Sequence, residues 1–276
     1  MATIRITSPQ AKNHVKITVI GKPKLILVNG YCGKVLRFLH AGPGEAKEGY
    51  WHFFLNEGAE FDRFIEIAKA YFGDEDYQEK PYYANGISWF GVDKSGQDRK
   101  DAGYKYANKD LAEIVKGVGH EKLYFISHSE GCAFAAGMAK ALIEKGYKVG
   151  ESVMLSADEG DEFSVEGNYP CYQITAGYIE KVDVTKRRFR IDWIVGDHHI
   201  RGITRYGVYV VPYADSGCVH AATIEKAVFE KLKELKKITL IPKRTKWKVE
   251  YMVGVRNTTW HKIDDKIVIN DNIDIY

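Results

Sequence analysis

One segment constrains the fold of this chain more than any other. The apolar run LYFI at 123–126 is followed at once by SHSEG, and then by alanine-rich residues 132–145 that end at Gly146. The run is too short for a helix and suits a buried strand of a parallel sheet, so the segment predicts a strand that turns sharply into a helix. A serine at the tip of such a turn projects its hydroxyl group outward. Ser129 is therefore the candidate nucleophile.

The residues around Ser129 fit a sharp turn, with one departure from the usual pattern. Such a turn needs small residues two positions before and after the serine. These positions hold Ser127 and Gly131, so the motif is SxSxG rather than GxSxG. Ser127 keeps the small size but loses the backbone freedom of glycine. The alternative reading is a serine that only caps the following helix.

Strand-like and helix-like segments alternate along most of the chain. Short β-branched or apolar runs occupy 3–7, 15–20, 25–28, 82–90, 152–156, 190–195 and 207–212, and helical spacing of apolar residues occurs at 61–72, 106–118 and 220–236. This alternation predicts an α/β fold with a mainly parallel sheet covered by helices on both faces. The segment 31–50 is rich in glycine and carries Pro43, which favours a long loop.

The character of the chain changes after residue 237. Residues 238–276 contain alternating and β-branched runs without helical spacing. We therefore expect an α/β domain over 1–237 and a small β-rich C-terminal appendage over 238–276. With 276 residues, of which 45% are hydrophobic, the chain is large enough to bury a sizeable core.

A nucleophilic serine needs a histidine base and an acid that orients it. In folds that place the serine on a strand-to-helix turn of this kind, these partners follow it in the order acid, then histidine. His220 lies in the polar loop ADSGCVH between a strand and a helix, so it is the candidate base. His261 falls in the β-rich tail, and His198 and His199 belong to the segment expected to present the acid.

Several aspartates compete for the role of the acid. Asp197 follows the strand-like RIDWIVG run, at the end of a strand where sheet topology places catalytic groups, and it is the favoured candidate. Asp158 and Asp161 follow the preceding strand, which presents the acid in some lipase lineages. Asp192 lies within the predicted strand and could instead be a buried structural carboxylate.

An oxyanion hole needs two preorganised N–H donors. The backbone of Glu130, the residue after the nucleophile, is the candidate for the first. The loop after strand 25–28 reads Asn29-Gly30-Tyr31, so the backbone of Tyr31 is the candidate for the second, with Cys32 as its alternative. The carboxylate of Glu130 would disfavour the developing anion unless it points away or is paired.

Composition excludes several other functions. A net charge of only +3 argues against nucleic-acid binding by phosphate neutralisation. The four cysteines form no CxxC pair, and adjacent histidines such as His198 and His199 rarely point at one ion, so we expect no metal site and no cofactor. We find no secretory signal or membrane-spanning run. We therefore expect a chain that is cytoplasmic or exported without a signal peptide.

The motifs together resemble a known superfamily. SHSEG, the strand followed by NGY, and the acid-then-histidine order resemble the α/β-hydrolases, particularly their lipase-like branch. The segments MLSADEGDEF, DWIVGDHHI and SGCVHAATI are similar to the class 3, or fungal-type, lipases over residues 24–236. The same serine and acidic phrases are similar to lipase-like domains of bacterial rearrangement-hotspot toxins. The resemblance implies Ser129, Asp197 and His220 as a catalytic triad.

The leading hypothesis is a serine hydrolase that cleaves carboxylic esters, with lipid esters as its substrate class and contact with a membrane surface. One alternative keeps the fold as a binding module without catalysis, with Glu130 and the missing glycine at 127 as signs of decay. Another is an antibacterial secreted lipase with an immunity protein as partner. Toxicity on periplasmic expression that is lost in Ser129→Ala would support that effector role.

Overall fold

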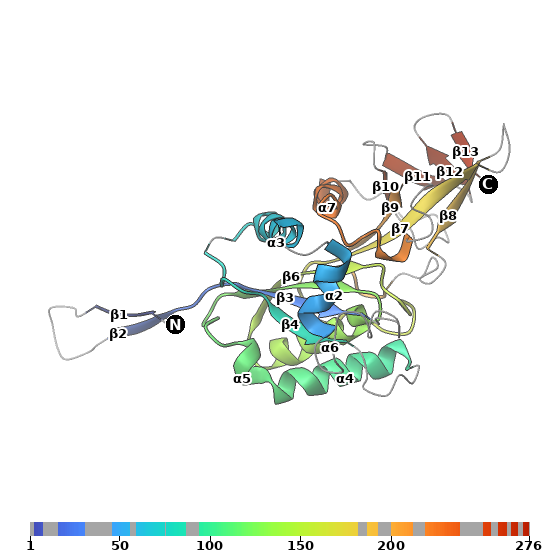
Figure 1. Cartoon of the computed structure of the whole chain (residues 1–276). Coiled ribbons are helices and arrows are strands. Elements are labelled where there is room, and N and C mark those ends of the chain that lie inside the picture. Colours follow the sequence, from blue (N-terminus) through green and yellow to red (C-terminus); the bar gives the residue numbers. More distant parts are fainter. Residues whose placement is uncertain are drawn as a thin grey trace.

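The computed structural model describes most of the chain in separate stretches. These are residues 3–7, 16–30, 46–55, 59–74, 76–86, 94–181, 187–192, 200–211 and 219–237, together with four short C-terminal strands. Within these residues, one 11-stranded sheet forms the centre of the molecule (Figure 1). A separate two-stranded antiparallel hairpin pairs β1 (Thr3–Thr7) with β2 (Lys16–Ile20).

The sheet is mainly parallel. Its parallel strands, in spatial order, are β4 (Tyr82–Asn85), β3 (Lys24–Asn29), β5 (Lys122–His128), β6 (Lys148–Leu155), β7 (Cys171–Lys181), β9 (Arg205–Val211) and β10 (Tyr251–Gly254). The antiparallel strands are β8 (Arg187–Ile191), which pairs with β7, and β11 (Thr259–Ile263), β12 (Lys266–Ile269) and β13 (Ile273–Ile275) at the far edge. The predicted α/β fold is confirmed.

Helices cover both faces of the sheet (Figure 1). The first face carries α2 (Ala46–Leu55), α3 (Ala59–Phe72) and α7 (Val228–Lys237), and the second carries α4 (Gly96–Lys109), α5 (Leu111–Ile114) and α6 (Gly131–Glu144). Side chains alternate between the two faces along each strand. Leu27 of β3 packs toward the first face, whereas Ile26 packs toward the second.

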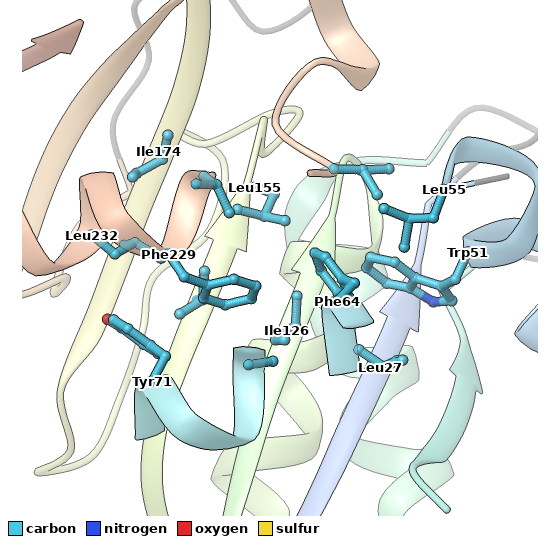
Figure 2. Close-up of a cluster of buried hydrophobic side chains, with 14 of the residues drawn as sticks. Leu27, Trp51, Leu55, Phe64, Tyr71, Ile126, Leu155, Ile174, Phe229 and Leu232 are labelled. Atoms are coloured by element: carbon cyan, nitrogen blue, oxygen red, sulfur yellow. The ribbon is translucent and has the colours of Figure 1, made fainter. Parts of the chain in front are cut away.

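The core under α2, α3 and α7 is built from aromatic and aliphatic side chains. Figure 2 shows the strand residues Ile126, Leu155 and Ile174 against Phe64 of α3 and Phe229 of α7. The Phe64 and Phe229 rings are 5.2 Å apart, a separation at which aromatic pairs are attractive. This core fixes the positions at which the central strands end.

Close packing of α4 against α6 depends on two glycines. A Cβ atom at Gly103 would lie 2.0 Å from the backbone oxygen of Phe134, and one at Gly137 would lie 1.8 Å from the backbone oxygen of Lys100. Any larger residue would push the helices apart. Since α6 begins directly after Ser129, this packing also anchors the start of the candidate site.

The structure corrects several predicted elements. Strand β7, at the centre of the sheet, was not predicted. Helix α2 begins within the stretch predicted to be a loop, and α4 begins at Gly96 instead of residue 106, because Ser95 caps it with a hydrogen bond to the Asp98 N–H. The last helix, α7, begins at Val228, so His220 lies in a preceding turn and not in the helix.

The C-terminal strands extend the main sheet. β10 pairs with β9 in parallel, and β11, β12 and β13 follow as an antiparallel meander. The region is rich in strands, as expected. The domain boundary at residue 237 stays a prediction.

Candidate active site

The turn between β5 and α6 has the geometry of a nucleophile elbow. Ser129 has a φ angle of +55°, a left-handed conformation that costs about 1–2 kcal/mol for a residue other than glycine. Its amide donates to the oxygen of Leu155 at 3.0 Å, and its own oxygen accepts from the Cys132 N–H at 3.0 Å. These two bonds hold the serine in its strained conformation between the sheet and the helix.

The neighbours of Ser129 explain why the turn needs small residues. A Cβ atom at Gly131 would lie 2.6 Å from the oxygen of Asn29, so no side chain fits there. Ser127 is fully buried, and its hydroxyl lies 3.4 Å from the Val153 oxygen. The departure from glycine at residue 127 is therefore accommodated within the sheet.

Ser129 and His220 lie in hydrogen-bond contact. The serine Oγ is 2.9 Å from Nε2 of His220, and Nδ1 of the same ring is 2.6 Å from Oδ2 of Asp192. A carboxylate only accepts hydrogen bonds, so Nδ1 carries the hydrogen and Nε2 is free to accept from the serine hydroxyl. This is the arrangement in which a histidine acts as the base for a serine.

The carboxylate in this chain of hydrogen bonds belongs to Asp192, which the sequence left as an alternative. Its side chain is fully buried and its amide donates to the Ala176 oxygen at 3.0 Å. Asp197, the favoured acid from the sequence, lies outside the described residues. The other two candidates are Asp158, which is half-buried, and Asp161, which is exposed. Neither is the hydrogen-bond partner of His220 Nδ1, because Asp192 occupies that position.

The register of the sheet explains how Asp192 reaches His220. His128 at the end of β5 is level with Leu155 of β6, which is level with Ile174 of β7. β7 continues beyond this edge to Lys181, and β8 returns antiparallel to it. The return ends one residue before Asp192, which brings this carboxylate back beside the carboxyl ends of the central strands.

These features decide the type of fold. A serine stands on a left-handed turn between a buried parallel strand and a helix, and the acid and the histidine follow it in that order at the carboxyl edge of the sheet. The fold is that of an α/β-hydrolase.

Comparisons with known proteins give only distant similarities to this chain. No family model and no curated protein sequence matches it. A solved structure described as a cell surface hydrolase from Lactobacillus plantarum is 12% identical, with a TM-score of 0.41 over 80% of this chain and 94% of its own.

Two further solved structures are similar at the same level. RedJ is 9% identical, with a TM-score of 0.36 over 78% of this chain and 89% of its own. Phospholipase PlaB from Legionella pneumophila is 10% identical, with a TM-score of 0.37 over 90% of this chain and 67% of its own. Similarities this distant assign neither an activity nor a substrate.

The carboxylate of Glu130 is paired and does not face the nucleophile unopposed. Two nitrogens of Arg99 each donate to one of its oxygens at 2.8 Å, a bidentate contact, and the Arg99 side chain is only 4% exposed. The Nε atom of Arg99 donates to the Lys94 oxygen at 3.0 Å and lies 3.4 Å from Glu159. Because its charge is paired with Arg99, the Glu130 carboxylate is compatible with an oxyanion hole at this position.

The loop after β3 approaches the serine closely at Gly30. A Cβ atom at Gly30 would lie 2.5 Å from the Cβ of Ser129, so only glycine fits. Asn29 donates from its Nδ2 to the Gly30 oxygen and to Asn85 Oδ1, both at 3.0 Å, which fixes this peptide group. Tyr31 and Cys32, the candidates for the second oxyanion donor, lie outside the described residues.

Two acidic groups beside the site have raised pKa values. Burial raises the pKa of Asp158, although the charges of His220 and Arg99 oppose the change. Burial also raises the pKa of Glu159 from 4.5 to about 7, against the lowering effect of Arg99. The carboxyl end of β6 is thus an acidic region balanced by one buried arginine.

Sequence reasoning missed three residues at this site, namely Arg99, Tyr50 and His128. His128 stood inside the quoted motif and could have been singled out, because an ionisable residue at the end of a buried strand is unusual. Nothing local distinguishes Arg99 or Tyr50, since the hydrogen bonds that tie them to Glu130 and His128 join residues far apart along the chain.

The described residues contain neither a cluster of metal-binding side chains nor a helix that could span a membrane. None of their histidine, cysteine, aspartate and glutamate side chains form a group of three or more that could bind a metal ion. Over the same residues, every helix is too short or too polar to cross a bilayer. His198 and His199 lie outside these residues, and His261 is described only as part of the β11 backbone.

Proposed function

We propose that this chain is a serine hydrolase that cleaves carboxylic esters through an acyl-enzyme, with lipid esters as its substrate class. One observation carries the proposal. The Ser129 hydroxyl, the His220 ring and the buried Asp192 carboxylate form a continuous chain of hydrogen bonds at 2.9 and 2.6 Å. Ser129 is also held on a strained turn between β5 and α6 by two backbone hydrogen bonds.

The proposed reaction has two halves. In the first, His220 Nε2 takes the proton of Ser129 as its Oγ attacks the ester carbonyl, and then gives that proton to the departing alcohol. In the second, His220 takes a proton from water as the water attacks the acyl-enzyme, and returns it to Ser129 as the carboxylic acid leaves. The Asp192 carboxylate accepts a hydrogen bond from Nδ1 and stabilises the charged imidazole in both halves.

The negative charge that develops on the carbonyl oxygen would be stabilised at the start of α6. The backbone N–H of Glu130 is the proposed first donor, and the N-terminus of α6 contributes a favourable dipole. The Arg99 contact draws the Glu130 carboxylate into an ion pair. The backbone of Tyr31 remains the proposed second donor, because Gly30 allows the chain to approach Ser129.

Aromatic residues on α2 support an apolar acyl group. The Phe54 ring lies 6.2 Å from the ring of His128, next to the nucleophile. The neighbouring Phe53 side chain is 40% exposed, and among the described residues it is the large hydrophobic side chain that is exposed to solvent. An acyl chain that packed on this surface would be removed from water, which favours lipid esters over small polar ones.

Labelling with a fluorophosphonate tests the proposal without knowledge of the substrate. We expect one adduct on the intact protein, absent from Ser129→Ala, and then hydrolysis of p-nitrophenyl esters with a preference for longer acyl chains. Folded protein that forms no adduct, with and without detergent, would favour the binding module without catalysis. An adduct that persists in Ser129→Ala would show that another residue is the nucleophile.

A further inference from the structure

A second histidine lies against the proposed base but takes no part in the reaction described above. His128 is the last residue of β5, immediately before Ser129, and its side chain is fully buried. Its ring centroid is 4.8 Å from that of His220, with the planes at 62°. Both of its ring nitrogens have hydrogen-bond partners, so it is built into the site and does not merely fill space.

The partners of His128 determine which nitrogen carries its hydrogen. Nε2 lies 2.9 Å from the backbone oxygen of His220, and Nδ1 lies 2.5 Å from the hydroxyl of Tyr50. A carbonyl oxygen only accepts, so Nε2 is protonated and donates to it. Nδ1 of the neutral ring is then bare and accepts from the Tyr50 hydroxyl. The His220 carbonyl thus selects the tautomer, and the Tyr50 hydroxyl stabilises it by donating to the bare nitrogen.

The surroundings of His128 keep its ring neutral. Complete burial lowers its pKa well below the ordinary value near 6.5, and a positive charge on His220 lowers it further. A neutral ring adds no repulsion when His220 becomes an imidazolium during the reaction. It therefore holds the base without competing with it for a proton.

The backbone around His220 needs such an anchor. Residues 219–227 form short turns, and regular helix begins only at Val228. A second anchor is the hydrogen bond between the buried hydroxyls of Ser156 and Thr223, at 3.0 Å. The contact from His128 acts on the carbonyl group of the catalytic residue itself, which leaves the His220 ring free to interact with Ser129 and Asp192.

We propose that His128 is a positioning residue for the catalytic base: it holds the backbone of His220 by a hydrogen bond from Nε2, and the Tyr50 hydroxyl stabilises the tautomer that makes this bond by donating to Nδ1. The inference rests on the proposed function, since it concerns the geometry of the same site. It also makes α2, which carries Tyr50, part of the structure that orients the base.

Three variants separate positioning from packing. His128→Phe keeps a flat buried ring but removes the donor, whereas His128→Gln can return an N–H donor close to the position of Nε2. Tyr50→Phe removes only the hydroxyl. The control is Tyr71→Phe. It removes a buried hydrogen bond of the same 2.5 Å length, from the Tyr71 hydroxyl to Glu151 of β6, away from the carboxyl end of that strand.

The measurements are the rate of fluorophosphonate labelling, kcat and KM for an ester, and the melting temperature. We expect His128→Phe to lower the labelling rate and kcat by about 10- to 100-fold with little change in KM, the effect of a misplaced catalytic group. His128→Gln should recover most of this loss, and Tyr50→Phe should fall between them. Tyr71→Phe should lower the melting temperature without slowing labelling of folded protein.

The outcomes are distinct. A wild type that does not label would overturn the proposed function and this proposal together. A wild type that labels, with His128→Phe labelling at the same rate, would overturn this proposal alone, as would a His128→Gln variant as slow as His128→Phe. Nitrogen chemical shifts by NMR give an independent test, because a ring of His128 protonated at Nδ1 would contradict the assigned tautomer.

Discussion

Removal of the Arg99 side chain tests how the site tolerates an acidic residue beside its nucleophile. Arg99 binds both carboxylate oxygens of Glu130 and lies 3.4 Å from Glu159, and these three side chains are 4%, 14% and 20% exposed. Arg99→Gln would leave two largely buried carboxylates facing a neutral amide. The double variant Arg99→Gln/Glu130→Gln would instead remove the closest charge pair together.

The burial of this pair sets the expected magnitude. Loss of one partner from a buried ion pair costs about 3–5 kcal/mol, because the remaining charge is left unpaired. Glu159 already has a pKa of about 7, so it can take up a proton and remove part of the unpaired negative charge. We therefore expect Arg99→Gln to lower the free energy of unfolding by about 3 kcal/mol at pH 7, and the double variant to recover at least half of it.

Urea unfolding and fluorophosphonate labelling at 20 °C measure the two consequences separately. We expect labelling of folded Arg99→Gln to slow by about tenfold, because an unpaired Glu130 would oppose the oxyanion, and the double variant to regain the rate. The control is Lys226→Gln, which breaks an exposed pair with Glu60 at 2.7 Å and should change the free energy of unfolding little. Arg99→Gln as stable as Lys226→Gln, or a double variant no better than Arg99→Gln, would refute the reasoning.

Three further predictions concern the acid, the helix packing and pH. Asp192→Asn should lower kcat by roughly 10³- to 10⁴-fold, whereas Asp197→Asn should leave it within about tenfold; the reverse order in steady-state assays would restore Asp197 as the acid. Gly137→Ala places a Cβ 1.8 Å from a backbone oxygen of α4 and should cost about 3 kcal/mol or more in urea unfolding, while Gly146→Ala, at φ +86° with open space around it, should cost only about 1–2 kcal/mol; equal losses would show that α4 and α6 can separate freely. Burial raises the pKa of Glu159 from 4.5 to about 7, so the folded state holds more protons than the unfolded state between these values and stability falls as pH rises through them. Glu159→Gln should therefore be more stable than the wild type at pH 7.5, by at most about 3 kcal/mol, with a smaller gain at pH 5; a gain that does not depend on pH would contradict this.

The nucleophile segment could be predicted because its signals are local. A short apolar strand at 123–126, a turn with small neighbours and a helix of small residues follow one another directly, and the structure has β5 and α6 in this place. The closeness of His220 to Ser129 also followed from chain order, because an α/β sheet brings the ends of its strands to one edge. Both inferences needed only the identity of elements and not their lengths.

β7 could not be predicted because its buried face carries polar residues. Gln173 and Thr175 are fully buried in the centre of the sheet, where sequence patterns lead one to expect apolar residues. Gln173 is satisfied by the N–H of Ile200, which it binds at 2.9 Å. That partner is 27 residues away along the chain, so no residue near β7 in the sequence indicates that the buried Gln173 side chain is hydrogen-bonded.

The preference for Asp197 as the acid also depended on the failure to predict β7. Prediction of a strand over 190–195 put Asp192 inside it and Asp197 at its end. With β7 present, β8 pairs with it only as far as the pair Gly177 and Ile191, and the strand ends there. The rule that catalytic groups follow the ends of strands then selects Asp192. The predicted strand boundary was wrong, because the boundary depends on the pairing with β7 and not on the composition of β8 itself.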